Sequence, residues 1–273
     1  MFRRRGSDGA GDVEAIEAKL DAAEDALDDD DAKRALRLCD EALRAARQVD
    51  HGELLALTLT TRAAALADLE RFADSERDAG NARLVDPESA AAAHQHGVAL
   101  YRLGRFAEAA AAFTDATGME PESAEPWHAL GRCSVWLDDR DAARAAFRRA
   151  AELDSEQFVI PVRIAAAEFD RIAAEAWRTV PSGFRALLDN AMVVAQPLPD
   201  IDDVENGFDP DTLGVYEGAT ALHSADVPER IVLFQRNHEN VCASLGALQE
   251  EIRRTILHEV GHHFGMEEGE LPF

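Results

Sequence analysis

Two histidines and a glutamate near the C-terminus have the spacing of a metal-hydrolase site. His258 and His262 are four residues apart, and Glu259 directly follows the first histidine. On a helix, residues four apart lie one turn above each other, so both imidazoles face the same point as metal ligands. Imidazole nitrogens bind zinc well, and Glu259 can accept the proton of a zinc-activated water. The pattern therefore predicts zinc-dependent hydrolysis with Glu259 as the general base.

A catalytic zinc needs a third protein ligand, and the residues after His262 offer one. Gly265 can take a positive φ angle and end the helix, so the chain can fold back toward the metal. Glu268 lies six residues after His262, the spacing of the third ligand in the extended form of the pattern. Glu267 and Glu270 are neighbouring carboxylates that could replace it. We predict Glu268 as the third metal ligand.

The elements that must position these residues follow from the hydrophobic pattern of the second half of the chain. Residues 245–264 predict a strong amphipathic helix that carries the histidine pair. Residues 156–179 also have apolar residues at helical spacing and predict one more helix. A stretch rich in proline and acidic residues at 197–211 is typical of a loop. The expected strands are at 192–195, 213–216 and 231–235, with a helical turn at 237–242.

Residues 156–271 resemble a known family of enzymes. The matching stretches are VPSGFRALLDNAMVVAQ, LGVYEG, PERIVLFQRN and IRRTILHEVGHHFGMEEGEL. They resemble the minimal zincin-like metallopeptidases of bacteria, and the resemblance implies a zincin fold, a zinc ion and peptidase activity. In that family the third ligand is often an aspartate, where this chain has Glu268. The resemblance also places residues 231–235 near the active-site helix, either as an exposed edge strand that pairs with an extended substrate or as an internal strand.

The first half of the chain repeats with a period of 34 residues. Pro87 and Pro121 are 34 apart, and so are Gly97 and Gly131. A 34-residue period with small residues where two helices cross is the signature of tetratricopeptide repeats. We expect three to four helical hairpins, with turns near Gly104 and at 138–139, stacked into a short solenoid. The concave face of such a solenoid commonly binds peptides, so we expect a protein partner there.

The composition and charge exclude several classes of partner. The formal net charge of −25 is spread over the whole chain, and a negative field repels nucleic acid and anionic membranes. The three cysteines are far apart in sequence and imply no disulfide framework. No apolar run reaches membrane-span length, and no apolar segment follows the basic N-terminus as in a secretory signal. We expect a cytoplasmic protein that binds neither nucleic acid nor membrane.

The sequence leaves two details of the site open: how the substrate is held, and which residue stabilises the oxyanion. Because the sequence ends at Phe273, we expect the substrate to be held by one wall with loops, or by the repeat domain. His263 and Tyr216 carry donors that could stabilise an oxyanion, although an ordinary structural role is the simpler interpretation for each.

The sequence thus predicts a multidomain chain: a disordered N-terminus at 1–11, an all-α tetratricopeptide-like helical solenoid at 12–155, and a small α+β zincin-like domain at 156–273. The second domain is expected to have a short β-sheet and an active-site helix. The predicted function is a zinc-dependent metallopeptidase that hydrolyses peptide bonds, with the repeats recruiting protein partners or substrates. The alternative is a non-enzymatic protein-interaction scaffold in which the metal has a structural role.

Overall fold

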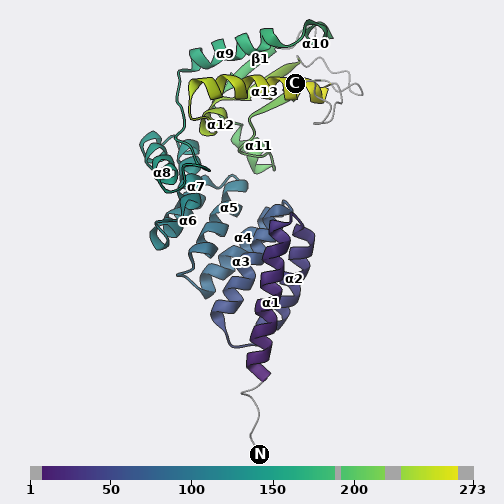
Figure 1. Ribbon diagram of the computed structural model, residues 1–273, viewed down its shortest axis with the longest axis vertical. Helices are drawn as coiled ribbons and strands as arrows, with labels where there is room; N and C mark the ends of the chain where they lie inside the picture. The colour runs from purple at the N-terminus through teal and green to yellow at the C-terminus, as the bar shows by residue number, and fades with distance from the viewer. Residues whose placement is uncertain (1–7, 188–191, 219–228, 264–273) are drawn as a thin grey trace, which may run out of the picture. The chain divides into compact units, whose positions relative to one another are not determined.

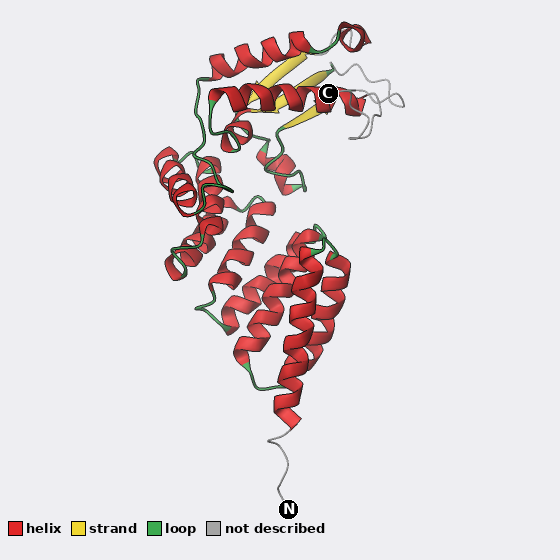
Figure 2. Ribbon diagram, viewed as in Figure 1, coloured by secondary structure: helices red, strands yellow, loops and turns green. Residues whose placement is uncertain are grey.

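The computed structural model describes residues 8–187, 192–218 and 229–263 of the chain (Figures 1 and 2). The chain divides into two compact units, Met1–Leu153 and Asp154–Phe273. The described residues contain no helix that is long and apolar enough to cross a membrane.

The first unit consists of helices that pack in consecutive pairs, so that each helix contacts the next along the chain (Figure 1). The described part of this unit forms four helical hairpins, at the upper end of the expected number. The helices are α1 (Asp8–Asp28), α2 (Ala32–Ala46), α3 (Gly52–Asp68), α4 (Phe72–Val85), α5 (Ala90–Arg102), α6 (Phe106–Met119), α7 (Ala124–Trp136) and α8 (Arg140–Leu153).

Each hairpin turns through one residue with a positive φ angle. These residues are Asp30 (58°), Glu70 (58°), Gly104 (73°) and Asp138 (53°), and the last three follow the 34-residue period. A left-handed residue lets the chain reverse after a helix, and glycine adopts it without steric cost. Only one of the four turns uses glycine, so the backbone geometry of the repeat is kept more strictly than its sequence.

Within a hairpin the two helices approach closely where one presents a small residue. A Cβ atom on Gly97 would lie 2.7 Å from the Phe113 ring, and one on Gly131 would lie 2.8 Å from the Phe147 ring. Both rings are fully buried. In the preceding hairpin the two equivalent positions, Ala63 and Ala79, are both alanine and both fully buried. This explains why small residues recur at this position of the repeat.

Helix α1 begins earlier than the sequence predicts. It starts at Asp8, so residues 8–11 of the segment expected to be disordered are helical, while residues 1–7 lie outside the described residues. Ile16 and Leu20 are buried in the core of this hairpin and fix the helix downstream. Once a helix is nucleated, each added residue gains a hydrogen bond at little cost, so the helix extends toward the N-terminus.

The second unit is a small α+β domain, and its described residues form a three-stranded sheet in the order β1-β3-β2. Strand β1 is parallel to β3, and β2 is antiparallel to it. The elements are α9 (Ala166–Thr179), α10 (Ser182–Leu187), β1 (Met192–Gln196), α11 (Ile201–Glu205), β2 (Gly214–Glu217), β3 (Arg230–Phe234), α12 (Gln235–Asn240) and α13 (Leu245–His263).

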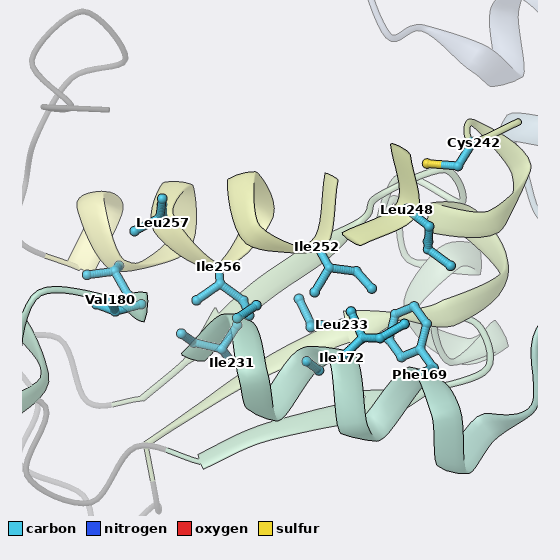
Figure 3. Packing of buried hydrophobic residues seen from close by; sticks show 13 residues of the cluster. Phe169, Ile172, Val180, Ile231, Leu233, Cys242, Leu248, Ile252, Ile256 and Leu257 are labelled. Atoms are coloured by element: carbon cyan, nitrogen blue, oxygen red, sulfur yellow. The ribbon is translucent and has the colours of Figure 1, made fainter. Parts of the chain in front are cut away.

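The core of this unit lies between the sheet and the two long helices α9 and α13, which pack against each other and against one face of the sheet (Figure 3). Side chains alternate along β3, so Ile231 and Leu233 both point toward the helices. From α13, Ile252 and Ile256 are fully buried against them, one helical turn apart. Each such side chain contributes roughly 1.5–3 kcal/mol of burial free energy. This core fixes the height and rotation of α13 above the sheet.

Three of the sequence-based expectations for this unit need correction. The helix expected at 156–179 begins only at Ala166, because Pro161 lacks an amide hydrogen and disfavours helical geometry in the residue before it. Instead, the amide of Val162 donates to the carbonyl of Cys242 at 2.8 Å. The expected loop at 197–211 contains the short helix α11. Finally, β3 is the central strand of the described sheet, so the exposed-edge interpretation of 231–235 is wrong and the internal-strand interpretation is correct.

Candidate functional site

The predicted catalytic residues lie on helix α13. His258, Glu259 and His262 all fall within its bounds, and the two histidines are separated by one turn, a rise of about 6 Å. His258 and Glu259 are half-buried, and the two residues before them, Ile256 and Leu257, are buried in the core. The helix thus carries both histidines one turn apart in the chain, and their role as metal ligands stays a prediction.

The third ligand predicted from the sequence cannot be placed. Glu268 and its alternatives Glu267 and Glu270 lie outside the described residues. Among the residues that the structure describes, no group of three or more histidine, cysteine or acidic side chains is arranged to hold a metal ion. The ligand set of His258, His262 and Glu268 stays a prediction.

Glu259 is held by the edge strand of the sheet. Its Oε2 atom accepts a hydrogen bond from the backbone amide of Tyr216 in β2 at 2.9 Å. The amide of Phe234 donates to the carbonyl of Leu213, so in this antiparallel pair the alternate residues 213, 215 and 217 face β3. The amide of Tyr216 therefore points away from β3, off the side of the sheet, and there it meets the carboxylate.

A glycine allows α13 to come this close to β2. A Cβ atom on Gly214 would lie 2.7 Å from Cγ2 of Thr255 and 3.1 Å from the carbonyl oxygen of Val232. From Gly214 to Tyr216 the strand advances about 6.8 Å, and from Thr255 to Glu259 the helix advances about 6.0 Å. Because the two steps match, the close contact at Gly214 brings Glu259 level with Tyr216.

A buried histidine in α12 contacts α13 at Thr255, the residue that also packs on Gly214. The side chain of His238 in α12 is fully buried, and burial lowers its pKa to about 4, so it is neutral near pH 7. Its Nδ1 atom lies 2.9 Å from the carbonyl oxygen of Phe234, which can only accept, so Nδ1 carries the proton. Its Nε2 atom lies 3.0 Å from the Thr255 hydroxyl. This chain of contacts ties β3 and α12 to α13 one turn before His258.

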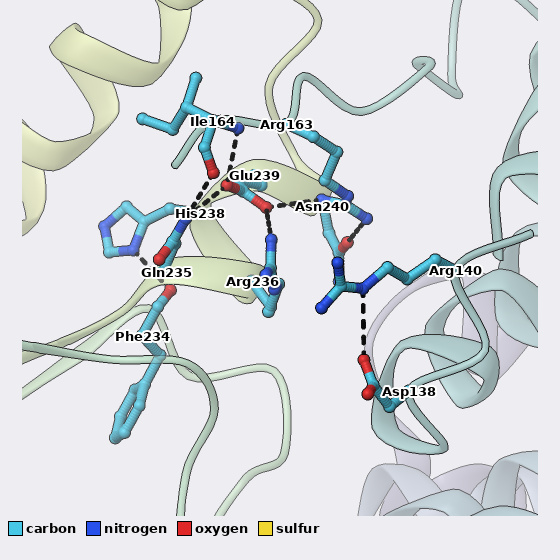
Figure 4. A network of polar contacts seen from close by, with 10 residues as sticks. All are labelled: Asp138, Arg140, Arg163, Ile164, Phe234, Gln235, Arg236, His238, Glu239 and Asn240. Atoms are coloured by element: carbon cyan, nitrogen blue, oxygen red, sulfur yellow. Dashed lines mark hydrogen bonds and ion pairs between the residues drawn. The ribbon is translucent and has the colours of Figure 1, made fainter. Parts of the chain in front are cut away.

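A buried carboxylate anchors the segment that precedes α9 (Figure 4). The side chain of Glu239 is 0% exposed. Its Oε2 atom accepts from Arg236 at 2.8 Å and Arg163 at 3.2 Å, while Oε1 accepts from Gln235 at 2.8 Å and the amide of Ile164 at 3.2 Å. A buried carboxylate with this many donors is fully satisfied. Glu239 is therefore a structural residue that fastens the chain after Pro161 to α12.

The side chain of Tyr216 makes contacts of its own, separate from the hydrogen bond of its backbone amide. Burial raises its pKa to about 12, and the negative charge of the neighbouring Glu229 adds to the effect. Its ring lies over Gly218, where a Cβ atom would come within 2.7 Å of the ring. The ring thus holds this end of β2 in place, which favours the structural role for Tyr216 over that of an oxyanion donor.

Sequence reasoning did not identify Gly214, the amide of Tyr216 or His238 as parts of the site. Glycine inside a strand pattern is a known signal of close approach by another segment, and the stretch LGVYEG carried that signal at Gly214. A backbone amide leaves no trace in residue types. His238 is a single histidine without a spaced partner, so nothing in its sequence context distinguishes it.

Comparison with known proteins supports both halves of the predicted organisation. Residues 188–272 match the family model of zincin-like metallopeptidases, and residues 100–157 match that of tetratricopeptide repeats. The chain thus joins a zincin-like segment to tetratricopeptide repeats, which confirms the resemblance and the predicted fold class. The zincin-like match begins at residue 188, so α9 lies outside it although its side chains complete the core.

Solved structures of repeat proteins also match the chain, whereas no curated protein does. YrrB, a tetratricopeptide protein described as having an unusual peptide-binding site, is 21% identical over 52% of this chain and 71% of that chain, with a TM-score of 0.42. MamA of AMB-1 is 21% identical over 51% and 73%, with a TM-score of 0.41. The repeat domain of Arabidopsis OM64 is 28% identical over 45% and 96%, with a TM-score of 0.40.

Proposed function

We propose that this protein is a zinc-dependent metallopeptidase whose helical repeats bind protein partners or substrates. The observation that carries the proposal is the position of Glu259. Glu259 follows the first of the spaced histidines on α13, and its carboxylate reaches the edge strand of the sheet. The match of residues 188–272 to zincin-like metallopeptidases supports the same reaction class.

The donors present fit zinc. His258 and His262 lie one turn apart on α13, and zinc favours imidazole nitrogen together with a carboxylate oxygen. We propose Glu268 as the third ligand. When bound, zinc polarises a carbonyl and lowers the pKa of a water molecule.

Glu259 acts as the general base. Its carboxylate takes a proton from the water that attacks the scissile carbonyl and returns that proton to the leaving amine.

The repeats are proposed to recruit the protein to its targets. Four stacked hairpins form an extended surface, and such solenoids bind peptides along their concave side. The match of residues 100–157 to tetratricopeptide repeats supports protein binding as the role of this unit.

The proposal is tested by zinc analysis of the purified full chain together with cleavage of a proteome-derived peptide library, read by mass spectrometry. Wild type should contain one zinc per chain and cleave peptides, while Glu259→Gln should keep the zinc and lose cleavage. Glu250→Gln is the matched control, since Glu250 is an exposed residue of the same helix that pairs with Arg253. Equal cleavage by wild type and Glu259→Gln would refute the proposed chemistry.

The alternative, a scaffold with a structural metal, makes a different prediction. The core of the second unit contains apolar residues of α9, β3 and α13. Examples are Phe169, Leu233 and Ile252, whose side chains do not bind metal. On our proposal, a chelator abolishes cleavage but leaves the helical circular dichroism signal unchanged. Loss of that signal on chelation would instead favour a structural metal.

A further inference from the structure

We infer that Tyr216 is the positioning residue for the general base, because its backbone amide holds the Glu259 carboxylate at the edge of the sheet. This inference rests on the proposed function, since it assigns a catalytic consequence to the contact. It concerns a residue that the motif on α13 does not contain.

The contact uses an amide that the sheet itself does not need. In the antiparallel ladder, Val215 and Glu217 face β3, and Tyr216 faces away from it. The Tyr216 amide donates to Oε2 of Glu259 at 2.9 Å. A carboxylate has two oxygens, so one can be held while the other accepts the proton. The amide therefore fixes Glu259 without consuming its basic function.

Glutamate has several rotatable bonds, and a base that must meet a bound water needs a fixed position. A hydrogen bond from a backbone amide to an ionised carboxylate is stronger than one between neutral groups. Misplacement of a reacting group by about 1 Å costs on the order of 100-fold in rate. A donor on a rigid strand is thus well suited to keep Glu259 in the productive position.

The strand is itself fixed at this point. The Tyr216 ring packs over Gly218 and against the core, and its hydroxyl lies beside Glu229. Two residues earlier, the absence of a side chain at Gly214 lets Thr255 come into contact. The position of the amide relative to α13 is therefore determined by packing on both sides, which is the condition for a positioning group.

The first arm of the test is amide hydrogen exchange, measured by NMR on the zinc-loaded full chain. The Tyr216 amide should be protected in wild type and exchange at least about tenfold faster in Glu259→Ala, since the carboxylate is its acceptor. The amides of Val215 and Glu217 face β3 and should keep their protection. Equal exchange of Tyr216 in both proteins would overturn the inference, whatever the protein cleaves.

The second arm compares Tyr216→Pro with Tyr216→Ala. Both variants lose the ring, but only proline removes the amide hydrogen, and an edge strand tolerates proline where the amide faces outward. We expect kcat of Tyr216→Pro to be about 10–100-fold below that of Tyr216→Ala, with KM and zinc content alike. Equal kcat values in two folded variants would overturn the inference. If wild type cleaves nothing, the proposed function fails, and the positioning role fails with it even where the exchange arm confirms the contact.

Discussion

Replacing Gly214 by alanine tests whether close packing of α13 on β2 sets the geometry of the site. The new Cβ atom would lie 2.7 Å from Cγ2 of Thr255, about 1 Å inside a normal carbon–carbon contact. It would also lie 3.1 Å from the backbone carbonyl oxygen of Val232, which cannot rotate away. Helix and strand must therefore separate, and the contact between Tyr216 and Glu259 lies on the same stretch.

The magnitude follows from two opposing effects. Inserting one methyl group into a filled contact costs about 1–3 kcal/mol. Alanine restricts the unfolded chain more than glycine and returns about 0.4–1 kcal/mol. We expect Gly214→Ala to lower the free energy of unfolding by about 1–2 kcal/mol.

A second substitution makes the prediction specific. Thr255→Ser removes the clashing methyl group but keeps the hydroxyl that lies 3.0 Å from Nε2 of His238. By itself it should cost about 1 kcal/mol for the lost buried methyl group. Combined with Gly214→Ala, it should cost at least about 1 kcal/mol less than the sum of the two single changes, because the methyl groups no longer collide.

The assay is urea denaturation of the full-length single and double variants, with peptide cleavage measured in parallel. A double variant whose loss equals the sum of the single losses would refute the reasoning, because it would show that the two positions do not meet. An unchanged stability of Gly214→Ala would refute it as well.

Three further changes test the packing around the site and in the repeats by urea denaturation. Glu239→Gln should lower the free energy of unfolding by about 2 kcal/mol, because it leaves Arg236 without its buried partner. We expect less than the full cost of breaking a buried ion pair, because Arg236 is 30% exposed. An unchanged free energy of unfolding would show that the network does not stabilise the fold. Burial lowers the pKa of His238 from 6.5 to about 4, so the unfolded chain takes up a proton in this window that the folded chain does not, and stability falls as the pH falls. Wild type should therefore lose about 2 kcal/mol more than His238→Gln between pH 7 and pH 5, and parallel pH profiles would contradict this. Gly97→Ala should cost about 1–3 kcal/mol through its contact with Phe113, and a stability equal to wild type would mean that this crossing is not tightly packed.

The sequence could predict the elements because local patterns determine them. The period of 34 residues predicts three of the four hairpins, and the histidine spacing with the apolar residues around it predicts α13. The sequence predicts a turn at 138–139, but the positive φ angles of Asp138 and Glu70 do not follow from residue type, since neither residue is glycine. They follow from stacking of the whole repeat, which outweighs the local cost of a positive φ angle.

The order of the strands depends on contacts between distant segments, and periodicity does not report them. One signal was present, because the continuous apolar run at 231–234 is typical of a strand buried on both faces. That run argued for a central β3 and against an exposed edge. Pro161 likewise argued against a helix through 156–179, although the apolar spacing continued across it.

The sequence predicts the side chains of the candidate site, but it does not predict the backbone contact that positions them. The pattern of His258, Glu259 and His262 identifies the helix and the chemistry, but the donor that holds Glu259 is a backbone amide on another element. Such a contact depends on strand register and on the close approach at Gly214, both of which are tertiary properties. Glu268 lies outside the described residues and remains a prediction from spacing.

The most direct test of the central claim is steady-state cleavage of one library-derived peptide by wild type and by Glu259→Gln, each with its zinc content measured in the same preparation. We predict equal zinc and a kcat at least about 100-fold lower in the variant, the size of effect expected for loss of a general base. A variant with full zinc that cleaves as fast as wild type would contradict it.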